Sequence, residues 1–146
     1  MRKYSRDARS PVPKSNNTSK IMSANVSKST KPEKALRSKL FLLGVRGYRV
    51  NYKKLPGRPD MVFTKSKVAI FVNGCYWHRC PVCNLPLPKH NSDFWREKFE
   101  RNVKRDDVKK LELERLGYRV LVVWECEIKN KMEYVAEKVR EAIGAR

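Results

Sequence analysis

The sequence predicts an α/β protein in which a mixed β-sheet is flanked by helices. Apolar residues follow a helical period in some stretches and a strand-like pattern in others, and the two kinds succeed one another in the order α-β-β-β-α-β-α. At 146 residues, the chain has the length of one ordinary domain and is long enough to bury a core. No internal repeat is visible.

The first element follows a predicted N-terminal arm, residues 1–32. This arm contains eight basic residues, one acid and seven serines, with little apolar surface to bury. Such a composition cannot offset the entropy of ordering, so we expect an arm that is mobile when free, followed by a folded domain over 33–146. Thr30-Lys31-Pro32-Glu33 has the form of a capping box, which predicts a helix over 33–44 that stops at Gly44.

The next three elements are predicted strands. "GYRVNY" (47–52) alternates between apolar and polar residues, and "LPGRP" (55–59) then interrupts it as a turn. "DMVF" (60–63) and "KVAIFVNG" (67–74) follow, and the second is apolar enough to be a central strand.

The C-terminal half is predicted to be helix, strand and helix. Residues 91–117 have a helical pattern, as one bent helix or two pieces, with Asn91 or Ser92 as the cap and Gly117 as the end. "YRVLVVWE" (118–125) is a predicted buried strand, and "MEYVAEKVREAI" (132–143) a predicted amphipathic helix.

The charge of the chain points to a polyanionic partner. Thirty-four Lys and Arg against fifteen Asp and Glu give a formal charge of +19, which favours nucleic acid because binding releases counterions. The alternative is a basic surface that serves only solubility. No secretory signal and no apolar run of about 20 residues is present, so we expect a cytoplasmic protein without a membrane span.

The four cysteines predict a metal site. Cys80 and Cys83 form a C-x2-C pair, and Cys75 and Cys126 each lie at the end of a predicted strand. Two strand ends brought together would complete a four-thiolate site that suits structural zinc, with no open position for catalysis. Four reduced, partly buried cysteines are the first alternative, and two disulfides the second.

Asp60 is the first candidate catalytic residue. It lies at a tight turn that leads into one strand, and a second strand ends at "VNG" about thirteen residues later. Restriction-type nucleases use this layout to bind Mg²⁺ beside the scissile phosphate. A Pro-Asp pair is also common in ordinary turns.

Four strings in order carry a family resemblance: "LPGRPDMVF", "VNGCYWHRCPVC", "FWREKFERNVKRD" and "LGYRVLVVWECE". Together they resemble the very-short-patch-repair (Vsr) endonucleases, from about Ser15 to Glu127. The resemblance implies a restriction-endonuclease-like α/β fold and a Mg²⁺-dependent DNA mismatch endonuclease. Such an enzyme would nick one strand 5′ to the T of a T·G mismatch left by deamination of 5-methylcytosine.

The resemblance also implies roles for individual residues. Asp60 and the carbonyl of Val72 would bind Mg²⁺, His78 would activate water, and Glu33 and Asp106 would lie near the same centre. Zinc would be held by Cys75, Cys80, Cys83 and Cys126. Tyr76, Trp77 and Trp95 would enter the base stack beside the mismatch, where unstacking costs least. Asn73 stands where many relatives have an acid or a histidine, which affects expectations of rate and metal preference.

Each residue also has a structural interpretation. Glu33 could be only the third residue of its capping box, Asp106 could form surface ion pairs, Trp95 could pack in the core, and His78 could orient the cysteine loop. At the level of function, two alternatives stay open: a restriction-type endonuclease or nickase of the same fold, and a non-enzymatic zinc module that binds mismatched DNA. We expect a monomer whose partner is double-stranded DNA, with mismatch-repair proteins as further candidate partners.

Overall fold

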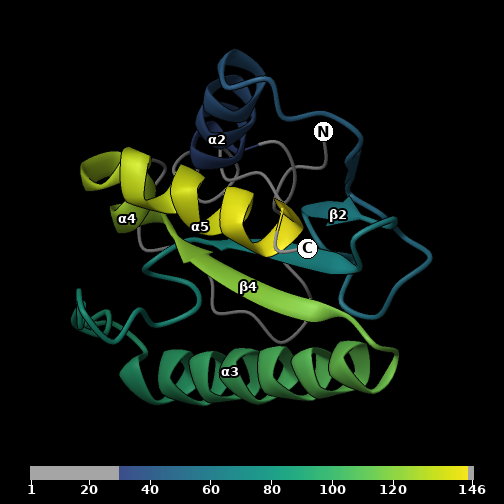
Figure 1. Cartoon of the computed structure of the whole chain (residues 1–146). Coiled ribbons are helices and arrows are strands. Elements are labelled where there is room, and N and C mark those ends of the chain that lie inside the picture. The colour runs from purple at the N-terminus through teal and green to yellow at the C-terminus, as the bar shows by residue number, and fades with distance from the viewer. Residues whose placement is uncertain (1–29, 145–146) are drawn as a thin grey trace.

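The structure, a computed structural model, describes residues 30–144, so all but the last three residues of the predicted arm lie outside the described range. Within that range, a four-stranded sheet has the order β1-β2-β3-β4 (Figure 1). β1 (Arg49–Val50), β2 (Met61–Phe63) and β3 (Val68–Asn73) are antiparallel neighbours, and β3 pairs in parallel with β4 (Arg119–Trp124). The predicted mixed sheet is therefore confirmed.

Helices cover both faces of this sheet. α3 (Ser92–Arg115) connects β3 to β4 and lies along one face, as expected for a crossover between parallel strands. α2 (Lys31–Leu42), α4 (Glu125–Asn130) and α5 (Met132–Gly144) gather on the other face. No helix in residues 30–144 combines the length and apolarity needed to cross a membrane.

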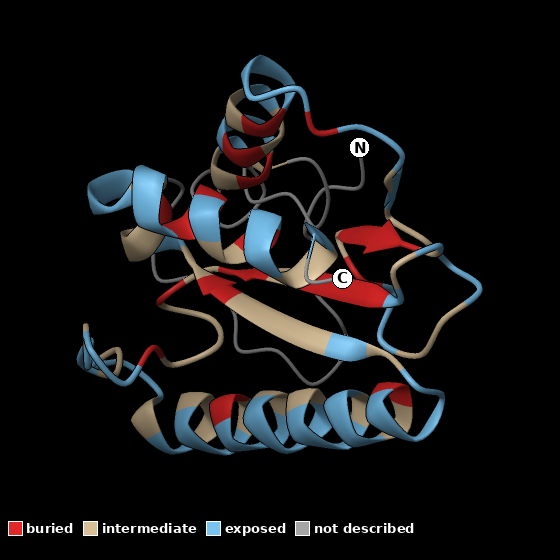
Figure 2. Ribbon diagram, in the orientation of Figure 1, coloured by how far each residue is buried: buried red, intermediate tan, exposed pale blue. Residues whose placement is uncertain are grey.

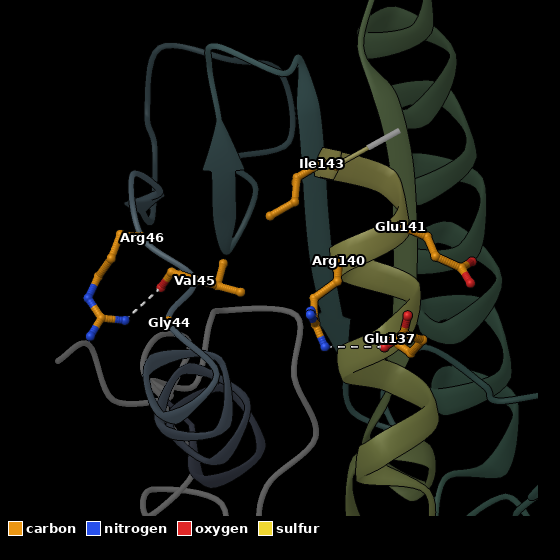
Figure 3. A pocket seen from close by; sticks show the side chains of 8 residues that line it. Gly44, Val45, Arg46, Glu137, Arg140, Glu141 and Ile143 are labelled. Carbon is orange, nitrogen blue, oxygen red and sulfur yellow. Dashed lines mark hydrogen bonds and ion pairs between the residues drawn. The ribbon is translucent and has the colours of Figure 1, made fainter. Parts of the chain in front are cut away.

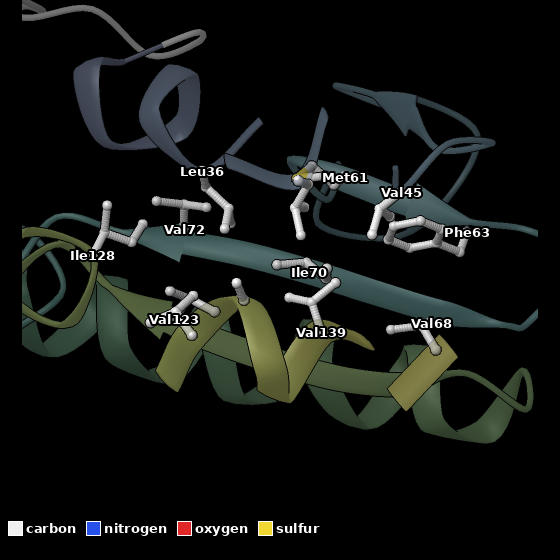
Figure 4. Packing of buried hydrophobic residues seen from close by; sticks show 13 residues of the cluster. Leu36, Val45, Met61, Phe63, Val68, Ile70, Val72, Val123, Ile128 and Val139 are labelled. Carbon is white, nitrogen blue, oxygen red and sulfur yellow. The ribbon is translucent and has the colours of Figure 1, made fainter. Parts of the chain in front are cut away.

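The main core lies between the sheet and the α2–α4–α5 layer (Figure 4). β3 sends Val68, Ile70 and Val72 into it, while Ala69 points toward α3 and packs with Leu113. Because both faces of β3 are covered, its sequence is a continuous apolar run, which explains why the central strand was predictable.

α2 begins two residues before the predicted start because Thr30 caps it. The Thr30 hydroxyl accepts a hydrogen bond from the Glu33 N–H at 3.4 Å, and Pro32 lies in the first turn, where its missing N–H costs nothing. The helix ends at Leu42, and Gly44 follows with φ +81°. The cap and the glycine stop of the sequence prediction are both confirmed.

α3 is one continuous helix of 24 residues, not two pieces. Asn91 occupies the N-cap position with φ 56°, but its side chain makes no capping hydrogen bond. Phe99 and Leu113 are its only fully buried residues, and most of the helix faces solvent (Figure 2). α3 therefore lies over the sheet as an outer layer whose exposed side carries basic and acidic side chains in similar numbers.

Two elements differ from the sequence prediction. The predicted strand over 47–52 is reduced to β1, although Asn51 and Tyr52 continue the ladder by donating to the carbonyls of Asp60 and Pro59. α4 was not predicted at all, because six residues are too few to show a helical period. The Trp124 N–H donates to Glu127 Oε1 at 3.1 Å, which caps this short helix directly after β4.

Candidate active site and metal centre

Asp60 and Val72 meet at the sheet edge where β3 ends. The register of β2 on β3 pairs Met61 with Ile70, so Asp60 falls beside the last residues of β3. The Val72 N–H donates to Asp60 Oδ2 at 2.6 Å. Because the N–H and C=O of a strand residue point to the same neighbouring strand, the Val72 carbonyl faces this edge as well. The structure thus brings together the two residues predicted as Mg²⁺ ligands.

The turn before Asp60 packs directly against α3. Gly57 has φ +76°, and a Cβ at this position would lie 2.9 Å from Lys109 Cβ. The close contact and the left-handed backbone both require glycine here. Arg58 donates its N–H to the Leu55 carbonyl at 3.2 Å, which closes the turn. "LPGRPD" is therefore a fixed turn that aims Asp60 at β3.

Glu33 adds a second carboxylate to the Asp60 site. It is only 3% exposed, and its Oε2 atom has no hydrogen-bond partner among residues 30–144. The guanidinium of Arg37 lies 3.7 Å from the same oxygen. Its backbone N–H is capped by Thr30, as predicted, but its side chain points inward to Asp60 and is more than a capping residue.

The surroundings of Asp60 raise the pKa of its carboxyl group from the ordinary value of 3.8 to about 7. Burial is the largest cause, followed by the charge of Glu33, while the Val72 N–H and the charge of Arg37 act in the opposite direction. Two neighbouring buried carboxylates, one of which has an oxygen without a hydrogen bond, fit a hard divalent cation with oxygen ligands.

His78 and Asp106 form a second pair beside the end of β3. The backbone N–H of His78 donates to the Gly74 carbonyl at 3.2 Å, which fixes the turn after the strand. His78 Nδ1 lies 2.6 Å from Asp106 Oδ2 on α3, and both side chains are partly exposed. A carboxylate on Nδ1 favours the tautomer that has its proton there, so Nε2 is the nitrogen able to accept a proton. The Lys and Arg residues next to Asp106 in sequence had left surface ion pairs as an alternative for this acid. In the structure its charged partner is His78.

The buried Asn73 lies between Val72 and His78 in the chain. It is the last residue of β3, 8% exposed, and separates Val72 from the loop that carries His78. The Asp60 site and the His78–Asp106 pair share the C-terminal end of β3, which is where ligands of open α/β sheets commonly bind.

The four cysteines converge as predicted, although 51 residues separate the first from the last. Their sulfur atoms all lie within 4.8 Å of one another, and Cys80 Sγ lies 3.8 Å from Cys126 Sγ. A tetrahedral metal with bonds of about 2.3 Å to sulfur places its ligands about 3.8 Å apart. All four thiols are free, which contradicts the two-disulfide alternative.

Local backbone hydrogen bonds shape this site. The Cys80 N–H donates to the Cys75 carbonyl at 2.9 Å, and the Cys126 N–H, in the first turn of α4, donates to Cys75 Sγ at 3.3 Å. Burial raises the pKa of the Cys75 and Cys126 thiols. Burial also acts to raise the pKa of Cys80, but the N–H groups of Cys83 and Val82 outweigh it and lower that pKa. A metal that binds here would take thiolate ligands and release the thiol protons.

The three residues predicted to enter the base stack belong to one aromatic cluster. Tyr76 contacts Trp77 edge to face, with ring centroids 5.2 Å apart, and Trp77 lies 5.9 Å from Trp95. The buried Phe99 lies within 6.0 Å of all three rings and forms the centre of the cluster. Tyr76, Trp77 and Trp95 are each partly exposed. They can therefore pack against the protein and still present ring edges outside.

Sequence reasoning missed two residues of the site. Phe99 follows Trp95 by four residues, and Arg37 follows Glu33 by four, so helical spacing would have placed each beside its partner. The pocket between the end of α2 and α5, lined by Arg46, Glu137 and Arg140 among others (Figure 3), contains none of the predicted site residues.

Comparison with known proteins gives consistent matches. The sequence model of the family described as "DNA mismatch endonuclease Vsr" matches residues 11–84. Type II nicking enzyme V.NmeAIP of Neisseria meningitidis is 48% identical over 72% of this chain and 74% of its own length. Type II nicking enzyme V.XorIIP of Xanthomonas oryzae is 45% identical over 71% and 76%. DNA mismatch endonuclease Vsr of Escherichia coli is 38% identical over 86% and 80%.

Proposed function

Because this chain belongs to the Vsr family of DNA mismatch endonucleases, we propose that it nicks one strand of duplex DNA 5′ to the T of a T·G mismatch, with Mg²⁺ as its cofactor. It is a DNA endonuclease, and its relatives include nicking enzymes and a mismatch endonuclease. The specificity for a T·G mismatch and the dependence on Mg²⁺ are the parts of this function that we propose. The product would be a nick with a 5′ phosphate, as required for repair of deaminated 5-methylcytosine.

The observation that carries this proposal is the position of Asp60. Its carboxylate accepts a hydrogen bond from the Val72 N–H at the end of β3, and the buried Glu33 carboxylate lies beside it. Asp60 and the Val72 carbonyl would hold Mg²⁺, and Glu33 would add a negative charge close to it. When bound there, Mg²⁺ supplies charge stabilisation for a phosphodiester that takes on negative charge during attack.

His78 would act as the general base. Asp106 holds its Nδ1 and orients the ring, so Nε2 can accept a proton from the attacking water as the water oxygen bonds to phosphorus. The bond from phosphorus to the 3′ oxygen would break in the same displacement, and the 3′ oxygen would leave and take a proton from solvent to become a hydroxyl. Asp106 also stabilises the imidazolium that this step forms, because a carboxylate at 2.6 Å is a strong partner for a cation. Asn73 cannot take a charge or a proton in this reaction, so His78 alone would carry the base function.

Zinc is the metal that we assign to the cysteine site. Four cysteine sulfur atoms within 4.8 Å of one another match the all-thiolate donor set of structural zinc. The site ties the end of β3 to the first turn of α4 and fixes the loop that carries Tyr76, Trp77 and His78. The zinc would thus act on the fold of the catalytic loop and not on the phosphate.

The aromatic cluster and the basic charge would provide DNA recognition. Tyr76, Trp77 and Trp95 would insert beside the mismatch, where a wobble pair loses less stacking energy than a normal pair. The chain's charge of +19 would bind phosphates along both strands, and the arm 1–32 would add to this contact. We expect a cytoplasmic monomer, with other mismatch-repair proteins as candidate partners.

The test is a nicking assay on a duplex with one T·G mismatch. Asp60→Ala should abolish the nick and leave DNA binding largely intact, because a metal ligand is lost but the basic surface is not. Full activity of Asp60→Ala would disprove the assignment. Asp107→Ala, an exposed acid next to Asp106, is the matched control and should retain activity.

A second candidate function is nicking at a fixed recognition sequence without a mismatch. The relatives named Type II nicking enzymes favour it, since they are at least as similar to this chain as the mismatch endonuclease is. Cleavage of fully paired DNA would support this alternative. Binding of the mismatch without cleavage at any tested sequence would instead support a non-enzymatic DNA-binding module.

A further inference from the structure

Arg37 is a half-buried cation next to the two acids of the candidate Mg²⁺ site. Its guanidinium NH1 lies 3.7 Å from Glu33 Oε2, one turn along α2, and the two side chains are 20% and 4% exposed. The order acid then base along the helix is the favourable one for such a pair. An ion pair in this setting is screened little by solvent, so it is unlike the exposed pairs elsewhere on the helices.

Three charges therefore lie together at this edge of the sheet. Asp60 accepts a hydrogen bond from the Val72 N–H, and Glu33 lies beside it. Arg37 forms an ion pair with Glu33 one turn further along α2. The charge of Arg37 also acts on Asp60, where it opposes the effect of Glu33 on the pKa. Glu33 has no other charged partner of opposite sign among residues 30–144 within ion-pair distance.

We propose that Arg37 is a positioning residue of the metal site: it fixes the Glu33 carboxylate beside Asp60, so that the pair is preorganised for a divalent cation. This inference rests on the proposed function, because it assigns Arg37 to the Mg²⁺ site proposed for Asp60. Residues that orient the groups around a metal typically change its affinity or the activity by roughly 10- to 100-fold when they are lost.

The charge of Arg37 and its positioning role predict opposite results. A guanidinium acting only as a nearby positive charge repels a dication, so Arg37→Met would tighten Mg²⁺ binding. A guanidinium that holds Glu33 in place makes binding roughly 10- to 100-fold weaker when it is removed. Arg37→Lys keeps the charge but not the size and shape of the guanidinium that reaches Glu33, so it should recover only part of the affinity.

The experiment measures Mg²⁺ affinity without DNA, from the rise of Tm during a Mg²⁺ titration at constant ionic strength. No chelator is present, so that the cysteine site keeps its metal. Lys34→Met is the matched control, since Lys34 is exposed on the same helix and the same charge is lost. We expect Arg37→Met to bind Mg²⁺ roughly 10- to 100-fold more weakly than Lys34→Met, with equal DNA affinity in Mg²⁺-free buffer. Equal or tighter Mg²⁺ binding would overturn the inference.

A double-mutant cycle covers the case in which Arg37→Met folds poorly. Removal of one partner leaves a buried unpaired charge, but Arg37→Met with Glu33→Gln removes both charges, so the double variant should be more stable than the sum of the single effects predicts. Additive effects would contradict the pairing. A wild-type protein whose Tm does not respond to Mg²⁺ would count against the proposed function itself, whereas a normal wild-type response with an unchanged Arg37→Met would count against Arg37 alone.

Discussion

The substitution Asp60→Asn should make the Mg²⁺-free protein more stable at alkaline pH, although it should abolish the proposed activity. Burial and Glu33 raise the pKa of Asp60 to about 7 in the folded protein, against 3.8 in its ordinary state. The folded state therefore binds this proton more tightly than the unfolded state does. Its contribution to stability is complete below about pH 4, and is lost as the pH rises to about 7.

The size of the effect follows from the difference between the two pKa values of Asp60. At about 1.4 kcal/mol per pH unit, the difference between 3.8 and about 7 corresponds to roughly 4 kcal/mol. The asparagine amide carries no charge, and its oxygen can still accept the Val72 N–H. Asp60→Asn should therefore raise the free energy of unfolding by about 2 to 4 kcal/mol at pH 8, and by much less at pH 4.5.

Urea unfolding at both pH values measures this directly, in buffer that contains neither Mg²⁺ nor chelator. Asp107→Asn is the control, because this acid is exposed on α3 and should show no such dependence on pH. Saturating Mg²⁺ should reduce the advantage of the variant, since a bound cation favours the ionised carboxylate of the wild type. An equal effect of Asp60→Asn at pH 4.5 and pH 8 would refute the reasoning.

Three further predictions concern the other parts of the site. Asp106→Asn should lower kcat by roughly 10²- to 10⁴-fold with little change in DNA affinity, because His78 loses the carboxylate that orients it; an unchanged kcat in single-turnover nicking would contradict this. Phe99→Ala should lower the free energy of unfolding in urea by about 3 to 5 kcal/mol, since it removes the buried centre of the aromatic cluster. A loss below about 1 kcal/mol would show that the cluster repacks. Removal of the zinc proposed for the cysteine site, by a strong chelator, should lower Tm and not merely stop turnover, and Cys83→Ser should do the same. An unchanged Tm after the metal is shown to be gone would exclude a structural role.

The fold was predictable where the local pattern and the tertiary environment agree. β3 is covered on both faces, so its run of apolar residues indicates a central strand without ambiguity. α2 carries its own start and stop signals in Thr30 and Gly44. α4 has no such signal, because it is held by the contact of Glu127 with the Trp124 backbone and is too short for a periodic pattern.

The site was predictable only in part, because its contacts join residues distant in sequence. The C-x2-C spacing and two strand ends were enough to predict the cysteine cluster. The contact of His78 with Asp106 spans 28 residues, and the Lys and Arg residues next to that acid in sequence left surface ion pairs as an alternative. Only the family resemblance placed it near the catalytic centre, and Arg37 was found only when its distance to Glu33 was known.

The central claim is mismatch-specific nicking, and one experiment tests it most directly. A duplex with a single T·G mismatch, labelled separately on each strand, is compared with its T·A counterpart in the presence and absence of Mg²⁺. We predict a Mg²⁺-dependent nick 5′ to the T, in the mismatched duplex alone and in the T strand alone. Equal nicking of both duplexes, or nicking without a divalent cation, would contradict the account.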